Sequence, residues 1–476
     1  MSKLEYLRGF NNHFRSEALP GALPEGQNNP QVCPYNLYAE QLSGTAFTKA
    51  RDHNMRTWLY RIHPSVQHSK MEPSAVGGLG RAANEPKREF VVDPNQMRWQ
   101  PLDVPAKSEK EVTFIEGIVQ VSQAGDPAMK AGLAIHNYVC NSSMNQTCMT
   151  NADGDLLIVP QLGALTVKTE FGIMRVEPKE ICVVQRGMRF SVQVEEETNR
   201  GYILEIFSSH FILPDLGPIG SNGLANPWDF ETPVACYEDK QEEWVCYTKF
   251  AGAMFEMKQS FSPFNVVAYN GNYVPYKYDL RKFCCMNSVT YDHPDPSIYT
   301  VLTCQSTEPG VAVADFVIFP PRWMAMEHTF RPPWFHRNTM TEYMGMVWGE
   351  YDAKKGGFVP GGSSLHSCMT PHGPDSDTFK RFSDPDQVDT TQPAFFDKGL
   401  AFMFETTYIM GLTPQAVNAP NREFTYQECW QNMPNAFDPN DKAHAKTMAK
   451  STDILAWRDE SAAANTSSSK RPRQGK

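Results

Sequence analysis

The sequence has no long apolar stretch, no paired cysteine motif and no excess of positive charge. Its longest apolar runs are short pieces such as residues 156–159 and 316–319, far below the roughly 18 residues of a membrane-spanning helix. The net charge of −10 argues against a general nucleic-acid or anionic-membrane surface. The eleven cysteines include no CxxC pair, which argues against a disulfide framework or a cysteine-based zinc site and indicates reduced core thiols.

The amino-terminal segment also shows no secretory signal. Residues 1–10 mix Lys3, Glu5 and Arg8 with apolar residues and contain no hydrophobic segment followed by a small-residue cleavage site. Together with the reduced cysteines, this predicts a soluble, cytoplasmic protein. Charged residues make up only 21% of the chain against 41% apolar residues, so we expect a large packed core and exclude wholesale disorder.

Proline and glycine punctuate the whole chain, with 36 and 31 residues respectively. Within residues 153–207, glycines recur every nine residues at Gly154, Gly163 and Gly172. The pieces between them are rich in β-branched and aromatic residues, which predicts strands joined by tight turns. Over residues 190–195 apolar and polar residues alternate, so one face of this sheet should lie on a core.

A second strand-rich block spans residues 291–412, and we therefore predict a mainly β protein with a pair of sandwich or barrel domains and few peripheral helices. The domains are expected at residues 1–285 and 286–440, followed by an extension at 441–476. Helical periodicity occurs at 441–457, and residues 461–476 carry four basic residues and no acid, which indicates a disordered basic tail rather than a nucleic-acid-binding segment. The strand candidates of the second block are residues 299–303, 311–319, 344–348 and 401–407.

The twelve histidines are unevenly distributed. Five of them, at positions 293, 328, 336, 366 and 372, fall within 80 residues, where an even spread over 476 residues would place about two. Imidazole is the commonest neutral metal ligand and the side chain best suited to proton transfer near pH 7. The excess indicates a metal or acid–base site in the second block, although hydrogen-bonded core histidines are an alternative for each residue.

His336, Glu342 and His372 are the candidate metal ligands. On a straight strand His336 and Glu342 would lie about 20 Å apart, so they can share a metal only if the chain turns between them. Asn338, flanked by threonines, offers suitable turn chemistry. The glycine-rich segment 356–373 permits the sharp turns that would bring His372 back, and it lacks the Gly-Lys-Ser/Thr of a phosphate-binding loop.

The chemistry of such a site is not decided by its ligands. Two imidazoles and one carboxylate form the set of non-haem Fe(II) oxygenases, which leaves positions open for substrate and O2, but zinc takes the same ligands. His293, in an Asp-His-Pro-Asp segment, could be functional or part of an ordinary turn. Tyr351 could present its phenol to a substrate or simply pack with its hydroxyl satisfied.

Several longer segments carry more specific information. They include LPEGQNNPQ at 23–31, CPYNLYAEQLSG at 33–44, LPDLGPIG at 213–220, FSPFNVVA at 261–268, FPPRW at 319–323 and TPHGPD at 370–375. In these segments the chain resembles the homogentisate 1,2-dioxygenase family. The resemblance covers about residues 4–435 in order and does not extend beyond about residue 440.

The resemblance implies cupin-like jelly-roll β-sandwiches and an Fe(II) cofactor. It also implies opening of the homogentisate ring with O2 to give maleylacetoacetate, in tyrosine and phenylalanine catabolism. Carried onto this sequence, it implies His336, Glu342 and His372 as iron ligands, His293 as the catalytic acid–base residue, and Tyr351, His372 and His366 as substrate contacts. The amino-terminal jelly roll would be metal-free. Members of the family assemble as hexamers, dimers of trimers, so we expect a homo-oligomer.

Two other classes of protein remain as alternatives. A zinc-dependent cupin isomerase or hydrolase would use the same ligands but turn over without O2. A binding or storage cupin would have no open metal site. Neither the resemblance nor these alternatives assigns a role to residues 441–476.

Overall fold

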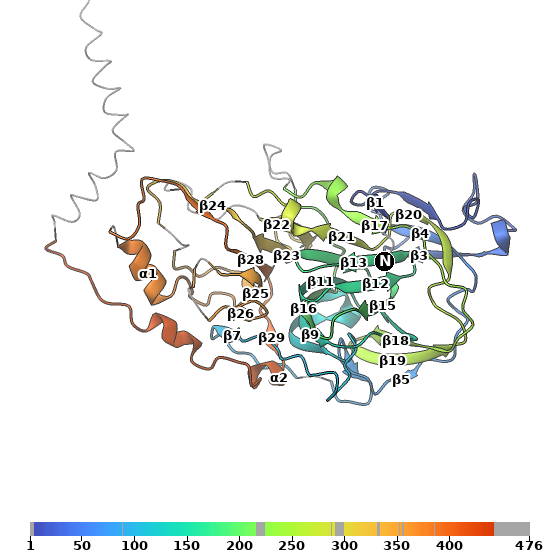
Figure 1. Ribbon diagram of the computed structural model, residues 1–476, viewed down its shortest axis with the longest axis horizontal. Helices are drawn as coiled ribbons and strands as arrows, with labels where there is room; N and C mark the ends of the chain where they lie inside the picture. The colour runs from blue at the N-terminus through green and yellow to red at the C-terminus, as the bar shows by residue number, and fades with distance from the viewer. Residues whose placement is uncertain are drawn as a thin grey trace, which may run out of the picture.

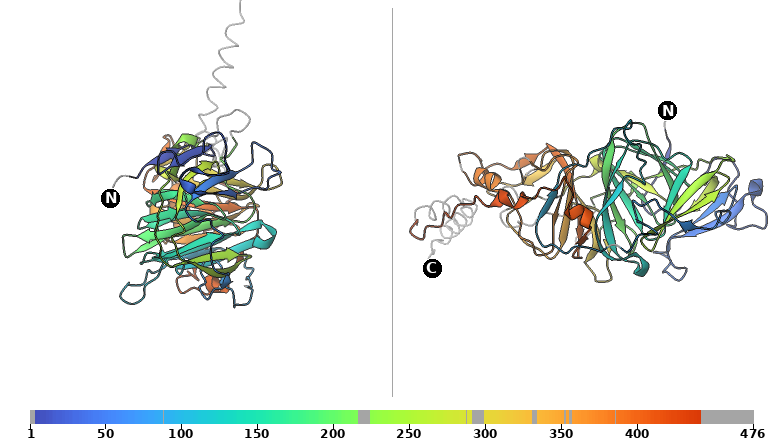
Figure 2. Two further views of the ribbon diagram at one scale, coloured as in Figure 1. Left: turned by 90° about the vertical axis from the view of Figure 1, so that its right-hand side faces the viewer. Right: turned by 90° about the horizontal axis from the view of Figure 1, so that it is seen from below.

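The computed structural model describes residues 4–441 apart from residues 88, 216–223, 287, 291–298, 331–333, 352, 355–356 and 385. Strands dominate, and the described residues contain two short α-helices, α1 (Ser376–Ser383) and α2 (Pro414–Val417). The prediction of a mainly β protein is confirmed. None of the described helices has the length and apolar character needed to cross a membrane. The strands form stacked sheets in an elongated molecule, and part of the blue, amino-terminal portion of the chain forms one of its ends (Figures 1 and 2).

A nine-stranded sheet occupies the centre of the molecule. Its strand order is β1 (Tyr6–Arg8), β17 (Glu231–Pro233), β21 (Tyr276–Asp279), β14 (Glu180–Val184), β11 (Asp155–Leu162), β16 (Asn199–Ile206), β9 (Ala131–Cys140), β8 (Ile118–Asp126) and β29 (Gly411–Leu412). Along β11, Leu156 and Ile158 belong to one core cluster, whereas Leu157 and Val159 belong to another. Because successive side chains of a strand point to opposite faces, this sheet is buried on both faces.

The first face of the central sheet packs against an eight-stranded sheet. Its members are β13 (Gly172–Val176), β12 (Leu165–Thr169), β15 (Arg189–Val194), β10 (Thr147–Asn151), β18 (Trp244–Phe250), β19 (Ala253–Gln259) and β5 (Glu72–Pro73), with β6 (Arg81–Ala82) paired to β19. Phe190 and Val192 face the shared core, as the alternating pattern predicted. Ser191 is buried as well, although the pattern predicted it on the solvent side, and its hydroxyl is satisfied by donating to the Met144 carbonyl.

The second face of the central sheet packs against a six-stranded sheet that carries the candidate site. Its order is β22 (Thr300–Gln305), β23 (Ala312–Phe319), β28 (Gly399–Thr406), β25 (Thr341–Gly349), β26 (Ser363–His366) and β7 (Met97–Trp99). The four strands predicted in this block are confirmed as β22, β23, β25 and β28. A two-stranded sheet of β24 (Arg322–Ala325) and β27 (Ala394–Phe396) accompanies them.

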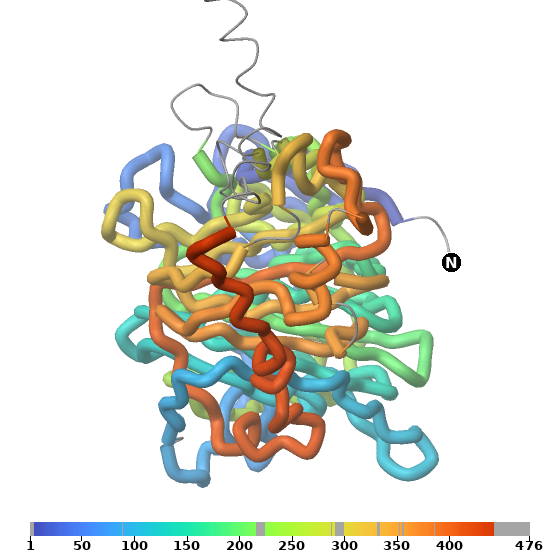
Figure 3. Tube along the Cα trace, turned by 90° about the vertical axis from the view of Figure 1, so that its left-hand side faces the viewer, coloured from blue at the N-terminus to red at the C-terminus, as the bar shows by residue number. Residues whose placement is uncertain are grey.

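Two short strands join sheets that are otherwise built from the other half of the chain. The early strand β7 pairs with β26, and the late strand β29 pairs with β8. Figure 1 shows β7 beside the orange strand β26. Figure 3 shows the red, carboxy-terminal part of the described chain crossing the end of the molecule that carries β7 and β26. The two β-rich regions therefore share backbone hydrogen bonds as well as a core. The domain boundaries at 285/286 and 440/441 stay predictions.

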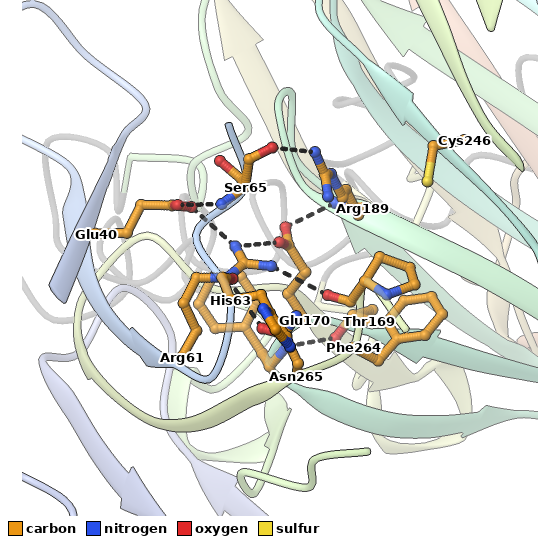
Figure 4. Close-up of polar contacts among 12 residues, drawn as sticks. Glu40, Arg61, His63, Ser65, Thr169, Glu170, Arg189, Cys246, Phe264 and Asn265 are labelled. Carbon is orange, nitrogen blue, oxygen red and sulfur yellow. Dashed lines mark hydrogen bonds and ion pairs between the residues drawn. The ribbon is translucent and has the colours of Figure 1, made fainter. Parts of the chain in front are cut away.

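A smaller sheet forms the amino-terminal arm, with the order β2 (Phe14–Glu17), β20 (Val266–Gly271), β4 (Arg56–Arg61) and β3 (Tyr38–Ser43). Arg61, at the end of β4, is fully buried. Its Nη1 lies 2.8 Å from Glu40 Oε1 and 2.9 Å from Glu170 Oε1, and its Nε donates to Asn265 Oδ1 (Figure 4). Because Glu170 follows β12, this cluster of charges fastens the arm to the eight-stranded sheet.

Two remaining predictions concern the cysteines and the carboxy-terminal extension. All eleven cysteines are free thiols, and six of them are buried. Cys236 and Cys284 are exposed, so the description as core thiols holds only in part. The predicted helix at 441–457, Asp441 excepted, and the predicted tail at 461–476 lie outside the described residues.

Candidate metal centre

Three side chains converge at one end of the six-stranded sheet. Glu342 is the second residue of β25, whereas His336 precedes this strand and His372 follows β26. One ligand atom from each residue lies within 4.8 Å of the other two. The structure therefore brings together the three residues that the sequence singled out as candidate ligands.

Local backbone structure explains how residues six apart can meet. Asn338 accepts a hydrogen bond from the Met340 amide at 3.0 Å and donates one to Glu342 Oε1 at 2.7 Å. This side chain closes the turn predicted between His336 and Glu342. The return from β26 is held by a backbone bridge, in which His336 and His372 exchange N–H···O hydrogen bonds of 2.9 and 3.0 Å.

The orientation of both imidazoles is set by backbone carbonyl groups. His336 Nδ1 lies 3.0 Å from the Trp334 carbonyl oxygen, and His372 Nδ1 lies 2.9 Å from that of Thr370. A carbonyl only accepts, so each neutral ring carries its proton on Nδ1 and keeps the Nε2 lone pair for a ligand. Both Nε2 atoms face Glu342, at 3.9 Å from Oε1 for His336 and 3.1 Å from Oε2 for His372.

The electrostatics of Glu342 favour a bound cation. Burial by itself would raise the pKa of Glu342, but the nearby imidazoles of His336 and His372, the latter within hydrogen-bond distance, outweigh it and hold this pKa well below the usual range. The neighbouring Glu342 carboxylate in turn raises the pKa of His336. Glu342 is thus a carboxylate at neutral pH, and a metal ion would take the place of the protons that otherwise neutralise this cluster.

The three residues line a cavity of about 130 Å³. Its walls are mostly apolar, with Phe319, Met344 and Met403 among them. Tyr351 and His366, which were expected as substrate contacts, also line it. His293, expected as the acid–base residue, lies outside the described residues.

Sequence reasoning missed two cationic residues of the cavity wall, Lys354 and Arg322. It also missed Tyr426, whose hydroxyl contacts Lys354 although the two residues are 72 positions apart. A lysine beside a glycine-rich segment normally indicates a solvated loop, and a tyrosine near the end of the chain carries no periodic signal. Only FPPRW at 319–323, which contains Arg322, marked this part of the wall.

Comparison with known proteins identifies the family. The family model described as homogentisate 1,2-dioxygenase N-terminal matches residues 5–280, and the one described as homogentisate 1,2-dioxygenase C-terminal matches residues 281–437. This chain belongs to the homogentisate 1,2-dioxygenase family. The human homogentisate 1,2-dioxygenase is 53% identical over 94% of this chain and 100% of its own length. That of Dictyostelium discoideum is 54% identical over 90% of this chain and 97% of its own length.

Solved structures similar to this member of the homogentisate 1,2-dioxygenase family include cupins. A putative dioxygenase from Nostoc punctiforme matches 71% of this chain and 87% of its own length, at 9% identity and a TM-score of 0.27. A cupin 2 conserved barrel domain protein from Leptotrichia buccalis matches 66% and 94%, at 7% identity and a TM-score of 0.22. These TM-scores are too low to support an argument about function, which rests on the family and the site.

Proposed function

We propose that this chain is an Fe(II)-dependent, ring-cleaving dioxygenase that converts homogentisate and O2 to maleylacetoacetate in tyrosine and phenylalanine catabolism. The observation that carries the proposal is the convergence of two imidazoles and one carboxylate on a mostly apolar cavity, in a chain matched almost end to end by this family. Because the match covers residues 5–437, the similarity is not confined to a single domain shared with otherwise different proteins. The three converging residues could hold the metal ion that a dioxygenase would use to react O2 with its substrate.

The donor set suits ferrous iron. His336, Glu342 and His372 would hold the ion with two neutral nitrogens and one carboxylate, and leave further positions for ligands from the cavity. Bound there, ferrous iron would supply the redox chemistry that lets O2 react with an aromatic ring. The backbone carbonyls that hold each Nδ1–H keep both rings in the tautomer that a metal ion needs.

The other residues of the cavity would bind and orient the substrate. Tyr351, His366 and His372 line the cavity; they would contact the substrate, with Tyr351 orienting the remote hydroxyl group. His293 would take up the proton of the phenol that becomes ionised on binding. With substrate bound, the apolar wall would exclude water and so strengthen each polar contact made inside the cavity.

The test is the stoichiometry of O2 consumption. With ferrous iron we expect equimolar uptake of O2 and homogentisate, and loss of uptake when a ferrous chelator is added. Turnover of homogentisate under anaerobic conditions would instead indicate a zinc-dependent isomerase or hydrolase. Absence of bound metal in protein purified under reducing conditions would indicate a binding or storage cupin.

We further propose that the chain acts in the cytoplasm as a homohexamer, a dimer of trimers. The free state of all eleven cysteines suits a reducing compartment. Large apolar side chains near the amino-terminal arm are exposed in the single chain, as expected of residues covered by another subunit. These side chains are Val32, Tyr35, Tyr38, Phe47 and Val66.

Light scattering after size-exclusion chromatography tests the hexamer, and a monomer at micromolar concentration would contradict it.

A further inference from the structure

The wall of the metal cavity contains a buried ammonium group. Lys354 is 7% exposed and lines the cavity together with the candidate ligands. Within the described part of the chain, no carboxylate lies within ion-pair distance of its Nζ. Taking a cation out of water without a counter-charge costs free energy, so this position requires an explanation.

The only polar contact shown for Lys354 Nζ in the described residues is with the Tyr426 hydroxyl. Its ammonium also lies 4.6 Å from the centre of the Tyr426 ring and 5.2 Å from that of Trp430. Aromatic faces attract a cation but do not neutralise it. Burial lowers the pKa of Lys354 to about 8, so the group is still charged at neutral pH.

Tyr426 connects this lysine to His366. An ammonium group can only donate, so the Tyr426 oxygen accepts from Lys354 and its own proton points to His366 Nε2, 3.0 Å away. His366 must then carry its proton on Nδ1. This Nδ1 is buried and has no hydrogen-bond partner among the described residues. Two donor groups therefore remain for a ligand: the N–H groups of the Lys354 ammonium that do not point to Tyr426, and the buried His366 Nδ1–H, which has no acceptor among the described residues.

These donors lie beside the candidate metal ligands. The rings of His366 and His372 are stacked, with centroids 4.3 Å apart and planes within 4°. The cavity, at about 130 Å³, is smaller than the roughly 300–1,000 Å³ of pockets for drug-sized ligands. A small ligand with a single ring could thus place its anionic group at these donors while its ring lies beside the metal position, because Lys354, His366 and the candidate ligands line the same cavity.

Arg322 is the other cation of the wall, but its guanidinium is already engaged. It lies 5.5 to 5.8 Å from the ring centres of Phe319, Tyr299 and Phe396, and its Nη1 donates to the Pro320 carbonyl. Of these rings, Phe396 is on β27 of the two-stranded sheet and Phe319 is on β23 of the six-stranded sheet. Lys354 is the better candidate for an incoming anion.

We propose that Lys354 binds the carboxylate of the substrate's acetate arm, with His366 Nδ1–H as a second donor, and that Tyr426 is the positioning residue that holds both. The inference rests on the proposed function, because homogentisate is the ligand that supplies the carboxylate. It names the part of the site that selects an aryl acetate over a neutral hydroquinone.

The experiment compares homogentisate with methylhydroquinone, which has the same ring and no carboxylate, for the iron-loaded wild type and Lys354→Met. We expect the KM for homogentisate to rise about 10- to 100-fold in the variant, the effect of losing a hydrogen bond to a charged group. The KM for methylhydroquinone should stay within about twofold of the wild-type value, because this compound has no carboxylate whose contact could be lost. Lys354→Arg, which keeps the charge, should restore part of the preference for homogentisate.

Binding without turnover provides a second readout. Equilibrium dialysis of homogentisate under anaerobic conditions should show the same loss of affinity in Lys354→Met, and Lys354→Gln replaces that variant if it does not fold. Tyr426→Phe should raise the KM for homogentisate and leave kcat near the wild-type value, because it disorders the donors without removing them. An unchanged KM in Tyr426→Phe would overturn its positioning role.

The outcomes separate this inference from the proposed function. If the wild type consumes O2 with homogentisate but Lys354→Met keeps the wild-type preference, only the carboxylate site is wrong. The same holds if the preference is lost in Arg322→Gln rather than in Lys354→Met. If the iron-loaded wild type consumes no O2 with homogentisate, the proposed function itself fails.

Discussion

The two β-rich regions each bury a lysine, a glutamate and a histidine, but they arrange them differently. In the amino-terminal region, Lys249 Nζ lies 2.6 Å from Glu205 Oε2, and His136 Nε2 lies 3.0 Å from the same oxygen. In the carboxy-terminal region, Glu342 faces two imidazoles, whereas Lys354 contacts the Tyr426 hydroxyl and forms no ion pair with a carboxylate among the described residues.

The difference separates a structural ion pair from a candidate binding site. Where lysine and glutamate touch, as Lys249 and Glu205 do, their charges neutralise each other. Where the two residues form no such pair, around the cavity, each would keep its charge for an external partner, which we propose to be a metal cation for Glu342 and an anion for Lys354. The same residue types therefore serve opposite purposes, and the packing between the strands decides which one applies.

The largest effect is expected from removing a candidate ligand. His336→Ala should lose bound iron, and O2 uptake with homogentisate should fall by more than about 100-fold, since even outer partners of metal ligands contribute 10- to 100-fold. Iron content by mass spectrometry and an oxygen electrode measure both. His136→Gln, in the amino-terminal cluster, is the control and should keep its iron. Stoichiometric iron and normal uptake in His336→Ala would show that the ligand assignment is wrong.

Breaking the amino-terminal ion pair should affect stability rather than metal content. Lys249→Met leaves Glu205 buried without its cation, so we expect the free energy of unfolding to fall by about 3–5 kcal/mol. Urea denaturation measures the change. The exposed pair of Lys258 and Glu243 provides the matched control, because Lys258→Met should cost less than about 1 kcal/mol. Equal losses in the two variants would contradict the comparison.

The lysine of the cavity should make substrate binding sensitive to pH. Burial lowers the pKa of Lys354 to about 8, so the free protein loses this positive charge as the pH rises through that value. The KM for homogentisate should therefore increase above pH 8, by up to about tenfold per pH unit. Lys354→Arg stays charged throughout this range and should abolish the increase. A rise of the same size in Lys354→Arg would assign it to another group.

The smallest expected effect concerns the contact between the two regions. Tyr202, on β16 of the central sheet, donates a 2.8 Å hydrogen bond to the Gly362 carbonyl just before β26. Tyr202→Phe removes this bond with little change of shape and should lower the free energy of unfolding by about 1 kcal/mol. Calorimetry should show one transition at a lower temperature. Two separate transitions would show that the regions unfold independently.

Much of the local structure was predictable because it depends on neighbouring residues. Runs rich in β-branched and aromatic residues located β22, β23, β25 and β28, and the chemistry of Asn338 located the turn that brings His336 to Glu342. The histidine excess pointed to the correct strand-rich block. The sharing of one central sheet by both regions was not predictable, because strands β7 and β29 pair with partners far away along the chain.

By itself, the sequence determined a β-rich protein, the turn before Glu342 and the three residues able to bind a metal. Only the tertiary structure decided that Lys249 meets a carboxylate while Lys354 meets Tyr426. The physical reason is that the interaction of buried charges depends on separations of a few ångströms. Those separations are set by how strands distant in the sequence pack, and no local pattern of residues contains them.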